Sequence, residues 1–292
     1  MEESMVQSVL PHFFPEGSVK SCCRYGCGHI NETYLVVTKK GRRYILQRIS
    51  SRAFPDVEGL QENIAAITQY LHSILDNPNA ALTLIPTLDG KNWYHQGIDS
   101  DWRVFAFIEG SVCLQAPQCP EDLYQSAIAF GSFQQQLSGF PAETLHETIR
   151  NFHNTPDRYR IFRETLEKDP MGRAASAERE IAFALEHEPV GGKLTQMLRD
   201  GVLPLRVTHN DTKLNNVMLD EKTHTPLCVI DLDTTMPGLS AYDFGDSIRF
   251  GAATAAEDET DLSKMEMDLD LYRIFTRGFL RACPALTQAE RK

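Results

Sequence analysis

Two short apolar runs in the second half of the chain each end directly in polar and acidic residues. Residues 203–208 precede His209 and Asp211, and residues 227–230 precede Asp231. Apolar runs of this length, bounded by polar residues, are typical of buried strands. Acids at the ends of strands sit on a rigid support, which is a common way to build a site. We therefore expect a fold organised around one site to which both runs contribute.

The first acidic segment, VTHNDTKLNNVMLD over residues 207–220, has an informative spacing. Asp211 follows His209 by two positions, and Asn216 follows Asp211 by five. This is the spacing of the kinase catalytic loop, in which the aspartate accepts a substrate hydroxyl proton and the asparagine binds magnesium. An amide oxygen suits magnesium and adds no negative charge beside phosphates. We expect Lys213 to offset charge on the transferred group, and His209 to brace the loop because Asp211 already serves as base.

The second segment, CVIDLD, places two aspartates at the end of an apolar strand. On an extended strand the side chains of Asp231 and Asp233 point the same way. With Asn216 they are predicted to hold one or two magnesium ions, Asp231 being the principal ligand. For Asp233 the alternative is a cap on the following turn. Asp243 spells the D-F-G metal motif but follows a turn that leads into a helix, so we expect it to cap that helix or brace the catalytic loop.

A segment with two glycines near the start of the chain is the candidate phosphate cradle. Residues 25–34, YGCGHINETY, lie between two predicted strands, and Gly26 and Gly28 let the backbone approach a ligand closely. With His29 and Asn31 they are predicted to bind the nucleotide, whereas an ordinary hairpin turn is the alternative.

The third predicted strand lacks the phosphate-binding lysine that a kinase-like order requires. It carries Gln47 and Arg48 instead. We predict that Arg48 serves in its place, because a guanidinium binds phosphate in a bidentate manner. Glu58 and Glu62 of the next helix fall nearly opposite its apolar stripe, so no standard lysine–glutamate pair is expected.

The patterns along the chain divide it in two. Strand formers are concentrated in residues 19–49 and 102–108, with one helix between them, and helical spacing predominates from residue 120 onward. The intervening helix carries an apolar stripe formed by Leu60, Ile64, Ile67, Leu71 and Ile74. We predict an α+β fold with a nucleotide-binding lobe over residues 1–109 and a catalytic and substrate lobe over residues 110–292. A cleft between lobes is the usual location for a ligand.

The composition is that of a globular protein with an acidic balance. The formal net charge is −11 at pH 7, so no nucleic-acid partner is expected. No apolar run approaches the roughly 20 residues of a membrane helix, and the N-terminus has no signal-peptide pattern. The seven cysteines lack zinc-finger spacing, which favours reduced thiols in a cytoplasmic protein. No oligomeric state is predicted.

Taken together, the motifs resemble those of the aminoglycoside phosphotransferase family, whose members share a bilobal protein-kinase-like fold. Within that family the chain is most similar to the bacterial N-acetylhexosamine 1-kinases. The resemblance rests on GHINETY, YILQRI, FHNTPDRY, THNDTKLNNVMLD and CVIDLDTTMPGLSAYDFGDSIRFGA. It implies a small antiparallel β lobe with one helix beside a larger, mainly helical lobe.

The resemblance also implies an activity, the transfer of phosphate from ATP to the anomeric hydroxyl of N-acetylglucosamine or N-acetylgalactosamine. Asp211 would be the base at the sugar, with Asn216 and Asp231 on Mg²⁺. Phe107, Ile108 and Glu109 would meet adenine.

His153 and Arg249 are the implied contacts to the sugar, although the loop at His153 fits a helix start equally well. The chain ends at Lys292, whereas relatives of this type continue with further helices that help to enclose the sugar. The sequence is therefore expected to be a short form or to lack C-terminal residues. The alternatives are another hydroxyl acceptor, such as choline, homoserine or an aminoglycoside, and a non-catalytic ligand-binding member of the fold.

Overall fold

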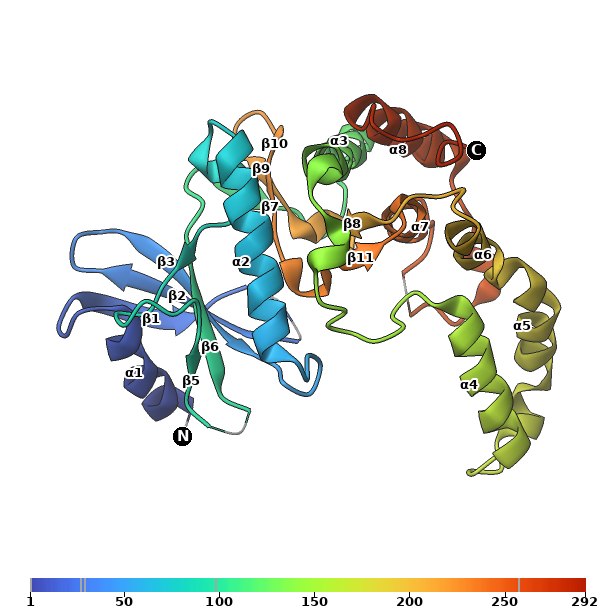
Figure 1. Cartoon of the computed structure of the whole chain (residues 1–292), viewed down its shortest axis with the longest axis horizontal. Helices are drawn as coiled ribbons and strands as arrows, with labels where there is room; N and C mark the ends of the chain where they lie inside the picture. Colours follow the sequence, from blue (N-terminus) through green and yellow to red (C-terminus); the bar gives the residue numbers. More distant parts are fainter. Residues whose placement is uncertain (1, 27, 29, 98, 257) are drawn as a thin grey trace.

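The computed structural model describes residues 2–26, 28, 30–97, 99–256 and 258–292. It consists of a lobe built on one antiparallel sheet and a mainly helical lobe with two smaller sheets (Figure 1). The predicted α+β fold is confirmed. Between the two lobes the long helix α2 runs beside the large sheet (Figure 1).

Six strands form the large sheet in the order β1-β2-β3-β6-β4, with β5 paired to β6, and every pair is antiparallel. The strands are β1 (Val19–Arg24), β2 (Glu32–Thr38), β3 (Arg43–Ile49), β4 (Leu84–Ile85), β5 (Tyr94–His95) and β6 (Asp101–Ala106). The tight turn between β2 and β3 contains Gly41, whose positive φ of 80° suits glycine. In the register of β3 and β6, Gln47 lies opposite Arg103.

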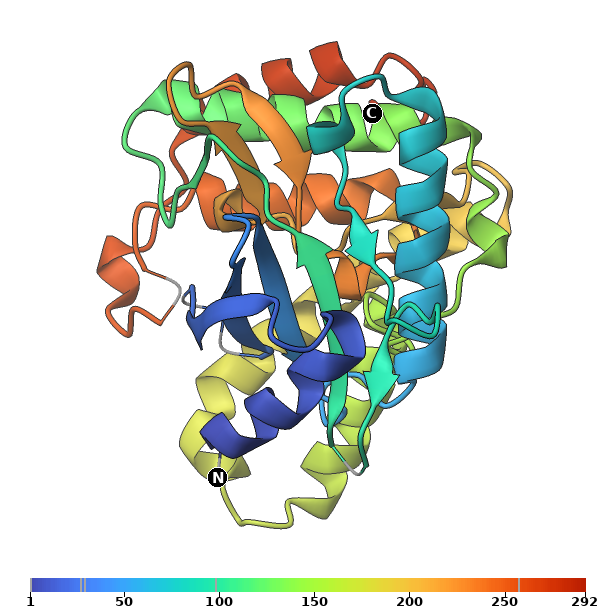
Figure 2. The same cartoon turned by 90° about the vertical axis from the view of Figure 1, so that its left-hand side faces the viewer.

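The two faces of this sheet are covered by different helices. Helix α1 (Glu2–Phe13), which we did not predict, packs on alternate residues of the central strands, such as Leu46, Trp102 and Val104. Figure 2 shows α1 on the near side of the sheet, away from α2. Because side chains alternate along a strand, residues such as Ile45 and Phe105 face the opposite way, toward α2 and the second lobe.

Helix α2 (Val57–Ile74) begins at Asp56, whose side chain accepts a hydrogen bond of 2.9 Å from the Gly59 amide. The predicted apolar stripe is confirmed for its first four members, which belong to the buried core: Leu60, Ile64, Ile67 and Leu71. Each such side chain contributes about 1.5–3 kcal/mol when fully buried. Its last member, Ile74, is 48% exposed because the helix ends there.

Among the residues described for the second lobe there are two small sheets and six α-helices. The sheets are β10-β9-β7 and β11-β8. Its strands are β7 (Ser111–Cys113), β8 (Arg206–Thr208), β9 (Val217–Asp220), β10 (Pro226–Val229) and β11 (Met236–Gly238). Its helices are α3 (Pro120–Gln136), α4 (Thr155–Lys168), α5 (Glu178–Gly191), α6 (Lys193–Arg199), α7 (Ser240–Gly251) and α8 (Leu269–Ala282). Figure 1 shows α4, α5 and α6 as an arm at the edge of this lobe.

Helices α3 and α8 pack closely against each other. A Cβ on Gly131 would lie 2.7 Å from the Phe279 backbone, and one on Gly278 would lie 2.8 Å from the Ala127 side chain. Glycine at both positions therefore lets the two helices approach. The core that includes this contact also contains residues of β8, β9 and β10, the strands that carry the polar segments.

The change from one sheet to the other occurs between β6, in the large sheet, and β7, which pairs with β9. The predicted division of the chain after residue 109 falls in this connection and stays a prediction. Among the described residues, no helix is long and apolar enough to span a membrane.

Candidate active site

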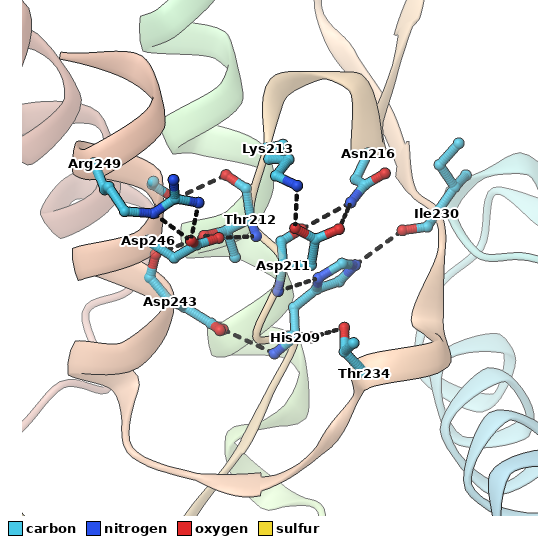
Figure 3. A network of polar contacts seen from close by, with 11 residues as sticks. His209, Asp211, Thr212, Lys213, Asn216, Ile230, Thr234, Asp243, Asp246 and Arg249 are labelled. Carbon is cyan, nitrogen blue, oxygen red and sulfur yellow. Dashed lines mark hydrogen bonds and ion pairs between the residues drawn. The ribbon is translucent and has the colours of Figure 1, made fainter. Parts of the chain in front are cut away.

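The catalytic-loop motif lies between β8 and β9, and its aspartate carries two contacts from its own loop. The Lys213 ammonium lies 3.1 Å from Asp211 Oδ1, and Asn216 Nδ2 donates to Asp211 Oδ2 at 3.0 Å. Asn216 Nδ2 also donates to the Asp211 carbonyl at 2.8 Å. Figure 3 shows Lys213 and Asn216 turned toward Asp211, with the Asn216 amide oxygen on the far side. The motif thus orients a partly exposed carboxylate and leaves an amide oxygen free to face elsewhere.

Asp243 holds this loop from below. Its carboxyl oxygens accept hydrogen bonds from the amides of His209 at 3.0 Å and Asn210 at 2.8 Å, and from Gln134 Nε2 at 2.6 Å. The side chain is 0% exposed, and burial raises the pKa of Asp243 while the bonds from the Asn210 and His209 amides lower it. The prediction that this aspartate braces the catalytic loop is confirmed.

His209 is the second brace, also as predicted. Its Nε2 lies 2.9 Å from the Ile230 carbonyl, and its Nδ1 accepts from the Asp211 amide at 3.3 Å. An acceptor at Nδ1 places the ring proton on Nε2, which then donates to Ile230. The histidine therefore joins the two polar segments through one ring (Figure 3).

Asp231 follows β10 in a backbone conformation that we did not predict. The strand ends at Val229, Asp231 has a φ of 58°, and residues Leu232–Thr234 form a single 3₁₀ turn, η6. The expectation of an extended CVIDLD strand is therefore wrong. The left-handed residue turns the chain, so Asp231 and Asp233 do not share one strand face.

Water reaches Asp231, although protein groups crowd around its carboxyl. This crowding raises the pKa of Asp231 to about 6, and the charges of Asp233 and Asp211 act in the same direction, whereas Arg103 and His209 lower it. A carboxylate in such surroundings gains from a cation.

Asp233 is buried and already paired. Its Oδ1 accepts from Arg103 Nη1 at 2.5 Å, and its Oδ2 accepts from Arg103 Nη2 at 2.9 Å and from Asn31 Nδ2 at 2.5 Å. With both oxygens engaged and 1% of the residue exposed, Asp233 is neither the expected second metal ligand nor a side-chain cap of η6.

The residues that remain for magnesium are Asn216, through its amide oxygen, and Asp231. Hard oxygen ligands of this kind fit Mg²⁺, which usually keeps one or two protein ligands and takes the rest from water and phosphates. Among the described residues, no three His, Cys, Asp or Glu side chains gather into a metal cluster. The two oxygen donors that remain, from Asn216 and Asp231, fit an ion that takes its other ligands from water and phosphates.

The glycine segment contributes Asn31 to this site. Besides its bond to Asp233, Asn31 accepts a hydrogen bond of 3.0 Å from the Ser50 amide through Oδ1. Gly26 has a φ of 76°, and among the described residues, its chain neighbours aside, no atom lies within 4 Å of where a Cβ would be. Gly28 is exposed. His29 lies outside the described residues.

Arg48 is not where the prediction requires it. It alternates with Gln47 and lies on the α1 side of β3, where it pairs with Glu32 at 3.2 Å and donates to the Asp99 carbonyl. Gln47 faces the other way and accepts from Arg103 Nε at 3.0 Å. Strand alternation thus directs Arg48 away from the second lobe, and Arg103 is the arginine that meets Asp233.

Beside the connection between the lobes lies an arginine that we did not predict as part of the site. Arg43 forms an ion pair with Glu109 and lies over the Phe107 ring at 4.0 Å. The hydrogen bond from Arg43 lowers the pKa of Glu109, an exposed residue at this rim. Tyr25 of the glycine segment meets Phe107 edge-on at 6.0 Å. Two aromatic rings therefore lie where the glycine segment meets the connection.

A separate pocket of about 360 Å³ adjoins the catalytic loop. His153 lines it, and its ring lies 4.6 Å from Phe152 and 5.0 Å from Tyr242. His153 Nε2 and Asn210 Oδ1 are buried, and neither has a hydrogen-bond partner among the described residues. Burial lowers the pKa of His153. Asn210 and Tyr242 escaped the sequence analysis because nothing in a short motif shows which side chain faces a pocket.

Arg249 lies on α7 and is not among the residues that line this pocket. It pairs with Asp246 at 2.9 Å, and Asp246 accepts from the Thr212 amide at 2.8 Å. Figure 3 shows Arg249 at the edge of the catalytic loop, which it contacts through Asp246.

Comparisons with known proteins give the chain a family and a fold. Residues 21–281 match the model described as APH: Phosphotransferase enzyme family. An aminoglycoside phosphotransferase structure from Alicyclobacillus acidocaldarius matches with a TM-score of 0.64 and 15% identity, over 97% of this chain and 79% of that one. A microcompartment-associated aminopropanol kinase matches with a TM-score of 0.62 and 18% identity, over 99% and 83%.

A third similar structure is an amicoumacin kinase in complex with AMP-PNP and Ca²⁺. It matches with a TM-score of 0.58 and 15% identity, over 97% of this chain and 77% of that one. At such identities the likeness establishes a kinase-like fold and leaves the substrate of this chain open.

Proposed function

The chain belongs to the phosphotransferase enzyme family, and we propose that it is an ATP-dependent kinase in which Asp211 accepts the proton of a small-molecule hydroxyl. The observation that carries this proposal is the Asp211 carboxylate, which is partly exposed and held by Lys213 and Asn216. The loop beneath it is fixed by His209 and Asp243. Such preorganisation is what a loose phosphoryl-transfer transition state needs.

In the proposed reaction the acceptor oxygen bonds to the γ-phosphorus as the bond to ADP breaks, and the hydroxyl proton passes to Asp211. Asn216 and Lys213 orient the carboxylate, and Lys213 offsets negative charge beside it. Asn216 and Asp231 would hold Mg²⁺, which when bound neutralises charge on the phosphates. The raised pKa of Asp231 supports this role, because burial and the negative charges of Asp233 and Asp211 disfavour its ionised form, which a bound cation would stabilise.

We place the nucleotide between the lobes. Tyr25 and Phe107 supply aromatic surface for the base, and Gly26 and Gly28 are exposed, which leaves their backbone accessible to phosphates. Glu109 lies on the rim of that region, paired with Arg43.

For the acceptor we propose the pocket beside Asn210. A volume of about 360 Å³ suits a small molecule, and the unpartnered atoms His153 Nε2 and Asn210 Oδ1 offer hydrogen bonds to neutral hydroxyl or amide groups. Burial keeps His153 uncharged near neutral pH by lowering its pKa. With the rings of Phe152 and Tyr242, this lining favours a neutral sugar, and we propose an N-acetylhexosamine phosphorylated at its anomeric hydroxyl.

One observation favours a second candidate. Glu147 also lines the pocket and is exposed there, and a carboxylate would attract an amino-alcohol or an aminoglycoside. The names of two similar structures, an aminopropanol kinase and an aminoglycoside phosphotransferase, belong to that class of acceptor.

The test is ADP release in the presence of ATP and Mg²⁺ across N-acetylhexosamines, other sugars, amino-alcohols and aminoglycosides. Asp211→Asn should lower kcat by roughly 10²–10⁴ with the nucleotide dissociation constant unchanged. Asp220→Asn, in an exposed turn, is the matched control that should behave as wild type. Phosphorus NMR should identify a sugar 1-phosphate. A 6-phosphate would refute the anomeric assignment, and no turnover with any acceptor would refute the kinase.

A further inference from the structure

The large sheet faces the second lobe with a neutral residue where a phosphate-binding lysine is expected. That position on β3 is Gln47, since Arg48 lies on the α1 side of the sheet. Directly across in the register, β6 carries Arg103. Arg103 is the single lysine or arginine that is fully buried among the residues the structure describes, at 1% exposed.

Each nitrogen of the Arg103 guanidinium has a partner. Nε donates to Gln47 Oε1 at 3.0 Å, and Nη1 and Nη2 donate to the two oxygens of Asp233 at 2.5 and 2.9 Å. The group also lies 5.1 Å from the centre of the Phe105 ring. A fork of this kind fixes both the distance and the plane of the carboxylate, which a lysine cannot do.

Asp233 joins the parts of the proposed nucleotide site. It lies two residues after Asp231, in the turn η6, and it accepts from Asn31 of the glycine segment at 2.5 Å. Asn31 in turn holds the Ser50 amide at the end of β3. One carboxylate therefore connects strand β6, the glycine segment and the segment that carries Asp231.

A buried ion pair contributes little net stability to the contact between two lobes. Apolar residues of similar volume would give comparable or greater stability, because the desolvation of both charges offsets much of their attraction. What the pair supplies is fixed geometry. In protein kinases a lysine on the third strand and a glutamate on the neighbouring helix must be paired for the phosphates to be placed.

We propose that the Arg103–Asp233 pair takes over this positioning role here, with its cation on the neighbouring strand and its anion on the segment that carries Asp231. Arg103 is then a positioning residue that acts through Asp233 on two things, the orientation of Asp231 and the place of the glycine segment. The inference rests on the proposed kinase function. It concerns the binding of the metal–nucleotide complex and leaves the acceptor pocket unchanged.

The experiment measures the dissociation constant of Mg²⁺·ADP by calorimetry, together with the KM for ATP and for the acceptor. Arg103→Gln and Asp233→Asn each should weaken Mg²⁺·ADP binding by ~10–100-fold, as is typical when a residue that orients a metal ligand is lost. The KM for the acceptor should change by less than about twofold in both, if the pocket is untouched. Arg103→Lys, which keeps the charge without the fork, should fall between wild type and Arg103→Gln.

The double variant Arg103→Gln/Asp233→Asn tests the pairing itself. Each single change leaves one buried charge without its partner, whereas the double change leaves none. The double variant should therefore bind Mg²⁺·ADP at least as tightly as the single variant that binds it less tightly. The losses of binding free energy in the two single variants should then clearly exceed, in sum, the loss in the double variant.

Arg206→Gln is the matched control, because Arg206 pairs with Glu290 at 2.5 Å in the second lobe, outside the proposed nucleotide site. It should lower the melting temperature while leaving the Mg²⁺·ADP dissociation constant as in wild type. The inference is overturned if Arg103→Gln and Asp233→Asn give that same pattern. If Arg103→Gln does not fold, Asp233→Asn and Arg103→Lys decide by the same criterion.

Failure of the inference and failure of the kinase proposal look different. A wild-type protein that binds no Mg²⁺·ADP refutes the kinase and the inference with it. A wild-type protein that binds normally, with variants that also bind normally, overturns the inference alone.

Discussion

Replacing Asp243 by asparagine should loosen the catalytic loop and measurably lower the free energy of unfolding. The carboxyl group accepts three hydrogen bonds, from the amides of His209 and Asn210 and from Gln134 Nε2, in a place with no exposed surface. An asparagine of the same size keeps one accepting oxygen and points an NH₂ group at a donor. At least one buried donor then loses its partner, which costs about 1–3 kcal/mol.

Alanine at position 243 would leave all three donors without a partner. The loss in the free energy of unfolding should then rise to ~3–9 kcal/mol, which approaches the whole stability of many domains. Asp243→Asn is therefore the informative variant. Because it displaces the loop that carries Asp211, we also expect kcat to fall by roughly 100-fold.

Urea unfolding followed by circular dichroism gives the free energy of unfolding, and ADP release gives kcat. The matched control is Asp220→Asn, since Asp220 also accepts two backbone amides, those of Lys222 and Thr223, but in an exposed turn. Its loss of stability should be clearly smaller. An Asp243→Asn protein that unfolds within about 0.5 kcal/mol of wild type would refute the reasoning.

Three further predictions follow from single groups. At low Mg²⁺, kcat/KM for ATP should fall as the pH drops through about 6, where Asp231 gains a proton. Added Mg²⁺ should shift the midpoint of this fall to lower pH, because the ion competes with the proton. A midpoint that does not change with Mg²⁺ concentration would contradict the role of Asp231 as a metal ligand. Burial alone would raise the pKa of Glu290, but its hydrogen bonds outweigh burial and lower the pKa from an ordinary 4.5 to about 2. The stability that Glu290 gives the folded protein is therefore fully present above pH 4.5 and is lost as the pH falls toward 2. The difference in unfolding free energy between wild type and Glu290→Gln should shrink over that range, and a constant difference would argue against it. A Cβ on Gly238 would overlap Thr208 across the β8–β11 pair, so Gly238→Ala should cost about 1–3 kcal/mol in urea unfolding, whereas Gly245→Ala, with open space on α7, should cost nothing.

Patterns that depend on neighbours in the chain could be predicted from the sequence. The spacing of Asp211 and Asn216 is a property of one loop, so the motif placed both side chains together. The same holds for the stripe of α2, where the helical period itself brings Leu60, Ile64 and Ile67 to one face. Asp243 could be assigned to the brace because its context, a turn before a helix, is local.

The tertiary structure decided what depends on which side of a strand faces the cleft and on where a strand stops. Both Ile45 and Leu46 are apolar, so the sequence does not show that Arg48 shares the α1 face and Gln47 the other. The left-handed turn at Asp231 is likewise invisible in CVIDLD.

By itself, then, the sequence determined the site's local chemistry, an aspartate and an asparagine on one loop with a further aspartate after a strand. Only the tertiary structure brought Arg103 to Asp233, 130 residues later in the chain, and Asn31 to the same carboxylate from 202 residues away. The physical reason is that a motif fixes distances along a few residues, whereas the partner of a buried charge is chosen by the packing of whole lobes.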